Sequence, residues 1–297
     1  MDELTTTPSR PVSFPNPSPG RSGAFNPSDL GLGTVIPVLG AHPQAGASGV
    51  ALALADAAAV AGLRVLLIDS ADPARSGLAG VCAVEGRSVP GAHGRSAMRI
   101  GTRTVQNSRL AVRRLVGTGT PITIAQLPLP TSWASAEPSD FDLTIVDVGW
   151  DVWPLTIPGE SLGPLLWCTG SPTCTFPVVV MRSTVGSVGL AEGMLTRYDT
   201  GVRQRGFVEM GCAVAVGGES WPTVVRAVMG LQLESLSERT LFISPSPEAA
   251  TAGWSVAPVP ANSVRTAMAL LQGVGGPIGE ALAPQQHNRK ARRFGRS

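Results

Sequence analysis

The chain has 297 residues and a formal net charge of +2; 43% of its residues are hydrophobic, 15% charged and 5% aromatic. A charge this close to zero excludes binding to nucleic acid through overall charge alone. The length allows one large α/β domain or two small ones, and a core of Val, Leu, Ala and Gly suits strands that helices bury on both faces.

The two ends of the chain differ in composition from its middle. Residues 1–30 are rich in Pro, Ser and Thr with few large apolar side chains, so we expect a disordered segment there. Residues 279–297 form a basic tail that holds Lys290, the only lysine of the chain. A solvated end and a weak contact with nucleic acid or an acidic membrane surface are both open for this tail. Between the two ends, residues 31–278 are predicted to form one domain.

In this middle part, apolar runs of strand length alternate with helical patterns. The predicted strands are the runs at 34–40, 64–69, 141–149, 176–183, 207–218 and 239–247. The predicted helices lie at 48–62, 184–199, 221–232 and 262–274. No convincing hairpin turn separates these elements. The alternation predicts an α/β fold with a doubly wound, mostly parallel sheet and helices on both faces.

The cysteines and the apolar windows bear on the compartment. The four cysteines (Cys82, Cys168, Cys174 and Cys212) show no C-x-x-C spacing, so we expect reduced thiols and no zinc site. The N-terminus is acidic and does not resemble a signal peptide, and charged residues interrupt the most apolar window, 49–68. These features predict a cytoplasmic protein without a transmembrane segment.

Three predicted strands end where open parallel sheets bind their ligands, at the carboxyl ends of the strands. The first ends at Gly40 and leads into the turn AHPQAGAS, and two others end at Asp69 and Asp147. In a P-loop, backbone N–H groups at a helix N-terminus hold phosphates, a lysine neutralises their charge, and Ser or Thr with a strand-end Asp holds Mg²⁺. Here Ser48 matches the magnesium-binding residue, but Ala47 stands in the place of the lysine.

Three segments in register resemble the ParA/MinD partition ATPases. VLLIDSADPARSGLA (65–79) is similar to the family's strand and Asp-x-Asp-Pro loop, and FDLTIVDVG (141–149) is similar to its second acidic strand. The end of the domain (241–271) is similar to the family's closing strand, Pro-containing loop and last helix. The resemblance covers residues 34–275 and implies a P-loop NTPase-like fold, ATP and Mg²⁺ as cofactors, and a protein partner or a self-dimer.

The resemblance also implies site residues. Nucleotide binding would fall to Gly40, His42, Gln44, Gly46, Ala47, Ser48 and Gly49. Mg²⁺ would fall to Ser48, Asp69 and Asp147. The candidate catalytic acids are Asp69, Asp72 and Asp147, because the family's acidic motif aligns either through Asp69 or through Asp72, and the second choice puts Ser70 in the first acidic position.

The loop departs from the family at the positions that carry its chemistry. His42 stands at the lysine that reaches across the family's dimer, Pro43 and Gln44 replace glycines, and Ala47 replaces the P-loop lysine. Pro43 has no N–H to donate, and Gln44 does not freely adopt the positive φ that glycine permits. The loss of cations that meet a triphosphate argues against hydrolysis at the family's rate.

Residues 87–116 carry seven arginines and no acidic residue. The candidates for contact with a nucleic-acid backbone are Arg99, Arg103, Arg109, Arg113 and Arg114. The ParA family binds DNA without sequence preference, and an acidic protein is an equally suitable partner for such a segment.

Three functions are therefore open. The first is a catalytically degenerate ParA/MinD-like protein that acts by interaction in DNA partition, conjugative transfer or the positioning of cellular machinery. The second is an ATPase or nucleotide-binding protein with an unorthodox loop, in which Arg75 or Arg182 replaces the lysine. The third is an α/β scaffold that binds DNA or a secretion or pilus component through its Arg-rich segment.

Overall fold

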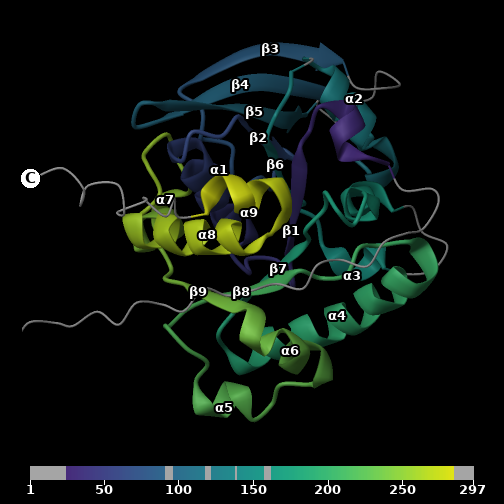
Figure 1. The fold of residues 1–297 in the computed structure, drawn as a ribbon, viewed down its shortest axis with the longest axis vertical. Coiled ribbons are helices and arrows are strands. Elements are labelled where there is room, and N and C mark those ends of the chain that lie inside the picture. The colour runs from purple at the N-terminus through teal and green to yellow at the C-terminus, as the bar shows by residue number, and fades with distance from the viewer. Residues whose placement is uncertain (1–24, 91–95, 118–121, 138, 157–161, 284–297) are drawn as a thin grey trace, which may run out of the picture.

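The computed structural model describes residues 25–90, 96–117, 122–137, 139–156 and 162–283. Within these residues nine strands form one sheet, in the order β3-β4-β5-β2-β6-β1-β7-β8-β9 (Figure 1). The strands are β1 (Thr34–Gly40), β2 (Val65–Asp69), β3 (Val84–Pro90), β4 (Ala97–Val105), β5 (Ser108–Val116), β6 (Leu143–Asp147), β7 (Val178–Arg182), β8 (Cys212–Val216) and β9 (Thr240–Ile243). All neighbours from β5 to β9 in this order run parallel, which confirms the predicted α/β fold with its doubly wound, mostly parallel sheet.

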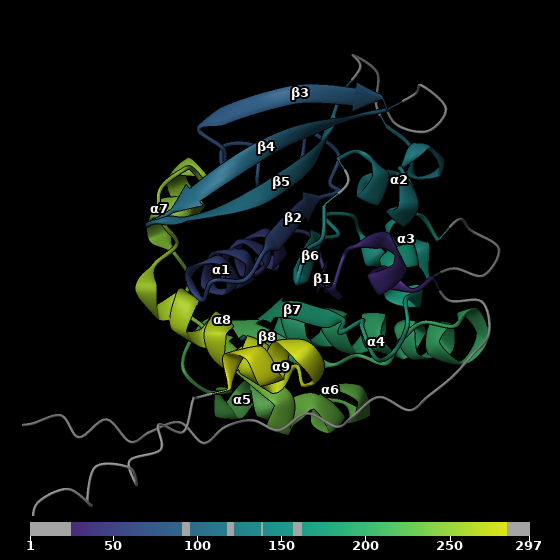
Figure 2. The ribbon, with the colours of Figure 1, turned by 45° about the horizontal axis from the view of Figure 1, so that its top comes forward.

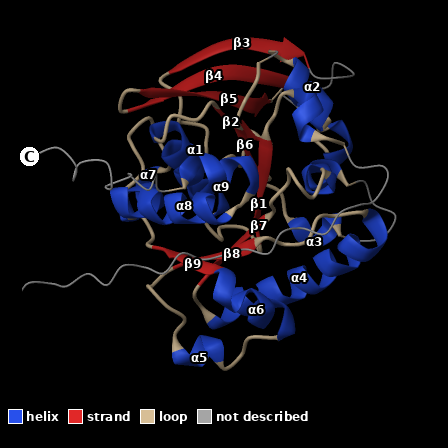
Figure 3. Ribbon diagram, in the orientation of Figure 1, coloured by secondary structure: helices blue, strands red, loops and turns tan. Residues whose placement is uncertain are grey.

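Helices cover both faces of the sheet (Figure 3). The α-helices are α1 (Ala47–Val60), α2 (Pro130–Ser135), α3 (Val152–Leu155), α4 (Val185–Arg205), α5 (Thr223–Arg226), α6 (Leu231–Leu236), α7 (Pro247–Ala252), α8 (Ala261–Gly273) and α9 (Gly276–Leu282). Four short 3-10 helices are η1 (Pro27–Leu30), η2 (Ile124–Gln126), η3 (Gly163–Thr169) and η4 (Ser237–Arg239). Helices α1, α8 and α9 share a core with one face of the sheet, and α3, α4, α5 and α6 share another core with the opposite face.

Helix α1 lies inside the protein. Every residue from Val50 to Ala59 is buried, and nine of these ten side chains are Val, Leu or Ala. Small side chains let the sheet and α8 approach the helix closely, and because both sides are covered the helix needs no polar face. The exception is Asp56, which is completely buried and pairs with Arg103.

The prediction that the fold has no hairpin was wrong. Strands β3, β4 and β5 form an antiparallel extension of the sheet (Figure 2), and the pair Val105 and Ser108 flanks a two-residue turn between β4 and β5. Gln106 in this turn has φ 53°, a conformation that usually calls for Gly or Asn. The sequence lacks the Asn-Gly or Asp-Gly signal of such a turn. Arginines at buried positions of β4 and β5 also interrupt the alternation of apolar and polar residues that would indicate two strands.

The fold extends slightly beyond the predicted domain limits. Residues 27–30 form η1, and Leu32 behind it is buried with Phe25 and Leu30 packed nearby. At the other end α9 continues to Leu282, with Ile278 buried. The rest of both predicted terminal segments lies outside the described residues. In the part of the chain that the structure describes, no helix has the length and apolarity to cross a membrane.

Candidate functional site

The loop between β1 and α1 forms one wall of a cavity of about 610 Å³ at the carboxyl ends of the strands. The loop closes on itself, because the N–H of Ala45 donates to the His42 carbonyl at 3.2 Å. Gly46 ends the loop at φ 102°, and a Cβ at this position would lie 2.9 Å from the Val216 side chain. Both the backbone conformation and the available space therefore require glycine at position 46.

Gln44 has a left-handed backbone conformation, which is less favourable for a residue with a Cβ than for glycine. It adopts φ 65° in the place of a family glycine. The Arg182 guanidinium, at the end of β7, supports this conformation, since its Nε donates to the Gln44 carbonyl at 3.0 Å. The loop thus keeps a left-handed residue without a glycine, at the cost in backbone strain that such conformations carry for residues with a Cβ.

The N-terminus of α1 opens on the same cavity. Gly46 precedes the helix, and no side chain among the described residues caps it. The N–H groups of Ala47, Ser48 and Gly49 have no acceptor within the helix, and the helix dipole adds partial positive charge at this end. Because these three residues line the cavity, this end of it favours an anionic group.

Two carboxyl groups end neighbouring strands. Asp69 on β2 and Asp147 on β6 are in register, and both are buried. Asp69 is held inside the protein by the Ser76 hydroxyl and by the Ala71 N–H, which both donate to its carboxylate. Asp147 lines the cavity, and neither of its oxygens has a hydrogen-bond partner of normal geometry among the described residues. Of the two acids, Asp147 is the one that can meet a ligand.

Burial raises the pKa of both carboxyl groups. It raises the pKa of Asp69 to about 6, although the hydrogen bonds from Ser76 and Ala71 oppose the rise. Burial and then the charge of Asp69 raise the pKa of Asp147 to about 7, and the nearby Ser48 hydroxyl and Gly149 N–H oppose this rise. A pKa raised in the folded state means that the folded protein binds more protons than the unfolded chain between about pH 4 and pH 7.

This proton uptake predicts how stability depends on pH at Asp147. The favourable contribution of the protonated Asp147 carboxyl group to the free energy of unfolding is complete below about pH 4. It is lost as the pH rises through 7. Asp147→Asn should therefore stabilise the protein relative to wild type at pH 8 more than at pH 4. Urea unfolding of both proteins across this range measures the difference. Groups that do not interact with Asp147 cancel in the comparison, whereas the neighbouring Asp69 contributes to the difference because its charge interacts with that of Asp147.

Asp142→Asn is the matched control for this pH series. The Arg64 guanidinium and backbone N–H hold the pKa of Asp142 below its usual range. The contribution of the Asp142 carboxylate to the free energy of unfolding is therefore present above about pH 4 and is lost as the pH falls. Relative to wild type, Asp142→Asn should therefore be less stable by a larger amount at pH 8 than at pH 3. A difference between Asp147→Asn and wild type that does not grow with pH would contradict the raised pKa.

Ser48 and Asp147 fit a hard divalent cation. The buried Asp147 carboxylate has no hydrogen bond of normal geometry from the described residues, and it lies close to the Ser48 hydroxyl. These groups supply oxygens of the kind that Mg²⁺ takes together with phosphate and water. The other acidic candidates serve the local structure. Asp72 accepts the Ala74 N–H at 2.9 Å, and Ser70, in the alternative alignment, donates its hydroxyl to the carbonyls of Asp147 and Val148.

The cations of the cavity come from elements other than α1. Ala47 ends in a methyl group, while Arg75 from the loop after β2 and Arg182 from the end of β7 both line the cavity. His42 is held within its own chain: its Nε2 lies 2.7 Å from the Ser187 hydroxyl at the start of α4, and its Nδ1 lies 2.7 Å from the Pro43 carbonyl.

Two tryptophans complete the cavity. Trp150 follows β6, donates its indole N–H to the Ser70 carbonyl at 2.7 Å and lines the cavity. Sequence reasoning missed Trp254, which follows α7 and packs against the first turn of α1. A Cβ on Gly49 would lie 2.5 Å from the Trp254 ring, so glycine at 49 allows this contact. A single tryptophan in a loop gives no sequence signal of such a role.

The structure contradicts the predicted basic surface for two of its five arginines. Arg103 and Arg113 are each only 1% exposed. Arg103 pairs with Asp56, and Arg113 donates to the backbone carbonyls of Trp133 and Glu137. These guanidinium groups satisfy buried acceptors, so they are not available to a phosphate backbone.

The other three arginines differ in exposure. Arg99 and Arg114 both pair with Glu85 on β3, and both are partly buried. Arg109 is the exposed member of the set. The expected cluster of five surface charges is therefore reduced to the exposed Arg109 and to Arg99 and Arg114, which share one carboxylate.

No protein-family model matches this chain, and no curated protein matches it either. Among solved structures it is similar to the MinC:MinD cell division complex of Aquifex aeolicus, with 14% identity over 79% of this chain and 93% of the other and a TM-score of 0.47. It is also similar to a plasmid partition protein of Borrelia burgdorferi bound to AMPPNP (12% identity, 81% and 97% covered, TM-score 0.47). A third similarity is to pNOB8 ParA bound to nonspecific DNA (11% identity, 82% and 93% covered, TM-score 0.46).

These similarities concern the fold. At TM-scores of 0.46–0.47 and 11–14% identity, they assign neither a family nor an activity to the chain.

Proposed function

We propose that this chain is a ParA/MinD-like protein of the cytoplasm that acts by interaction and does not hydrolyse ATP efficiently. The observation that supports this most is Ala47 at the first residue of α1, where a methyl group faces the cavity in the place of a cation. A hydrogen bond to a charged group contributes about 1.5–3 kcal/mol, and a contact formed in the transition state contributes to the rate directly. His42 does not compensate, because Ser187 and Pro43 hold its ring.

The partner in this proposal is a protein or a second copy of the chain, in DNA partition, conjugative transfer or the positioning of machinery. MinD is seen with MinC and ParA with nonspecific DNA in the similar structures. For this chain we favour a protein over DNA. Arg103 and Arg113 are buried, and Arg99 and Arg114 share the single carboxylate of Glu85, so the extension has less exposed positive charge than its five candidate arginines suggest. The same observations weaken the α/β scaffold that binds DNA through its Arg-rich segment.

A specific observation supports a second candidate, a nucleotide-binding protein with an unorthodox loop. Arg75 and Arg182 line the cavity that the α1 N-terminus and Asp147 also line. In this candidate the N–H groups of residues 46–49 and the two guanidinium groups would hold phosphates, and Ser48 and Asp147 would hold Mg²⁺. Bound ATP and Mg²⁺ would supply the phosphoryl-transfer chemistry.

Titration with a fluorescent ATP analogue and Mg²⁺, followed by a steady-state turnover assay, separates the two candidates. The first predicts no turnover above that of the Ser48→Ala and Asp147→Ala variants. The second predicts binding that Arg182→Met weakens by about tenfold or more, the loss expected for one charge-assisted contact. The matched control is Arg226→Met, an exposed arginine on α5 away from the cavity. Turnover that Ser48→Ala or Asp147→Ala abolishes would overturn the first candidate.

A further inference from the structure

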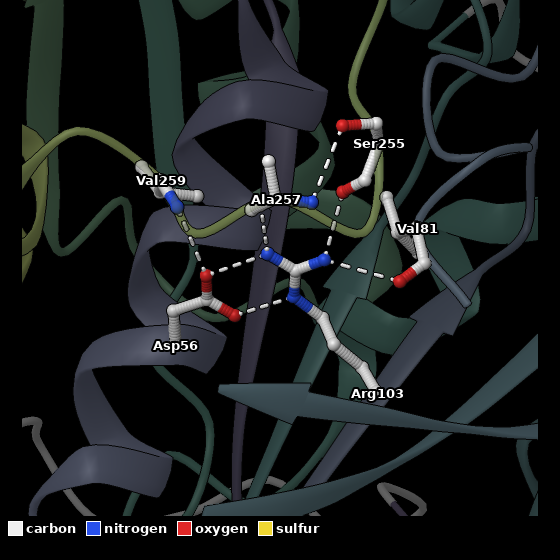
Figure 4. A network of polar contacts seen from close by, with 6 residues as sticks. All are labelled: Asp56, Val81, Arg103, Ser255, Ala257 and Val259. Atoms are coloured by element: carbon white, nitrogen blue, oxygen red, sulfur yellow. Dashed lines mark hydrogen bonds and ion pairs between the residues drawn. The ribbon is translucent and has the colours of Figure 1, made fainter. Parts of the chain in front are cut away.

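The Arg103 guanidinium joins four segments that lie far apart in the sequence (Figure 4). Its Nε and one terminal nitrogen donate to the two Asp56 oxygens of α1, at 2.8 and 2.9 Å. The terminal nitrogens also donate to the carbonyls of Val81, Ser255 and Ala257, at 3.0, 2.9 and 2.8 Å. All five N–H donors of the side chain are therefore used, inside the protein and without exposure of the pair to solvent.

The same network fixes the chain that follows Trp254. In this segment, residues 255–259, the carbonyls of Ser255 and Ala257 accept hydrogen bonds from Arg103. The Val259 N–H donates to Asp56 at 3.4 Å. The Ala257 N–H donates to the Ser255 hydroxyl at 3.2 Å. This stretch has no helix or strand of its own between α7 and α8, so side-chain acceptors and donors take the place of a backbone ladder there.

Trp254 stands at the start of this stretch and forms a wall of the cavity. Its ring lies over Gly49 in the first turn of α1, and its carbonyl lies close to Gly80, where a Cβ would come within 2.9 Å. Ser255, the residue that follows Trp254 in the sequence, accepts a hydrogen bond from Arg103 through its carbonyl. Arg103 itself does not line the cavity.

We propose that Arg103 is a positioning residue for the cavity: it ties β4 of the antiparallel extension to the segment that holds Trp254 against the start of α1. Through this guanidinium, the geometry of the cavity wall depends on the extension β3–β5. An occupant of the cavity that contacts Trp254 meets a wall that Arg103 has ordered in advance. This inference does not depend on what the cavity binds, because the order of residues 254–259 is measurable without a ligand.

The test removes the pair without leaving a buried charge. Arg103→Met in combination with Asp56→Leu replaces both charges by apolar side chains of similar size, whereas Arg103→Met alone would strand the Asp56 carboxylate and could prevent folding. Hydrogen exchange of the amides of residues 254–259 is the first measurement. The second is acrylamide quenching of Trp254, taken as the difference from the same protein with Trp254→Phe. We expect protection of the Val259 amide to fall by about tenfold or more, and Trp254 to become more accessible to the quencher.

Arg113→Met is the matched control. Arg113 is as buried as Arg103 and lies on the adjacent strand, but it donates to carbonyls around α2. Its loss should change exchange near residues 133–137 and leave residues 254–259 and Trp254 unaffected. Unchanged exchange and quenching in the double variant would overturn the proposal, and so would an equal change in both variants, which would indicate general loosening.

If a fluorescent ATP analogue binds the wild type, the double variant should also weaken that binding. A wild type that binds no analogue counts against the second candidate function, while the exchange result still decides the role of Arg103.

Discussion

Arg103→Met alone should lower the free energy of unfolding by about 3–5 kcal/mol, one of the largest effects of any single substitution in this protein. The substitution leaves the Asp56 carboxylate buried with only the Val259 N–H, at 3.4 Å, still directed at it. It also leaves the carbonyls of Val81, Ser255 and Ala257 without their donor. Urea unfolding at pH 7, followed by circular dichroism, measures the change.

Two further variants show whether the stranded charge is the cause. Asp56→Leu combined with Arg103→Met should recover the part of the loss that comes from the stranded carboxylate, since an apolar pair of similar volume replaces the buried ion pair. The carbonyls of Val81, Ser255 and Ala257 remain without their donor, so the rest of the loss should persist. Arg64→Met removes an ion pair whose arginine is 62% exposed, and its effect should be much smaller because solvent screens the pair. A single Arg103→Met variant as stable as the double variant would show that Asp56 finds another partner.

Ala47→Lys should strengthen the binding of ATP with Mg²⁺ by about 10- to 150-fold, the factor that corresponds to 1.5–3 kcal/mol for a charge-assisted hydrogen bond. The lysine side chain would extend from position 47, the first residue of α1, which lines the cavity together with Ser48 and Gly49. Gly46 and Gln44 both have left-handed backbone conformations, so the loop already turns as two glycines would allow it to. Titration with a fluorescent ATP analogue at fixed ionic strength measures the gain.

Ala47→Gln separates charge from length in this experiment. Its side chain reaches into the same space without a positive charge, so it should give little of the gain. A lysine close to a helix N-terminus is slightly unfavourable, so a small loss of stability, about 0.3–1 kcal/mol, should accompany the gain in affinity. Equal affinities of the Lys and Gln variants would show that the missing charge is not what limits binding, and would favour the candidate in which Arg75 and Arg182 already supply it.

Some of the site could be predicted because its signals are local. A strand that runs into Gly40, a glycine at 46 and a serine at 48 are each visible within a few residues, and the structure places all three around one cavity. The two acids at the strand ends, Asp69 and Asp147, were also visible in the sequence. The sequence did not show that their hydrogen-bond partners differ. The Ser76 hydroxyl donates to Asp69, while neither oxygen of Asp147 has a hydrogen-bond partner of normal geometry among the described residues. That difference depends on contacts made only when β2 and β6 lie side by side.

The arginines show the opposite case. In the sequence, Arg103 and Arg113 look like members of a basic run with Arg109, because sequence spacing does not reveal which face of a strand each will occupy. The hairpin places Arg103 against α1 and Arg113 against the segment around α2, and it leaves Arg109 exposed. The acidic partner of Arg103 lies 47 residues away, and one of its carbonyl partners lies 152 residues away.

The sequence by itself determined the fold class, the helix predicted at 48–62 and the absence of a lysine from the loop, since these follow from the order of apolar runs and from single residues. Only the tertiary structure decided which acid faces the cavity, that His42 binds Ser187 within its own chain, and that Trp254 forms a wall. The physical reason is range. Hydrophobic periodicity acts over one helix or strand, whereas the partners of buried polar groups come from segments that meet only when the sheet is assembled.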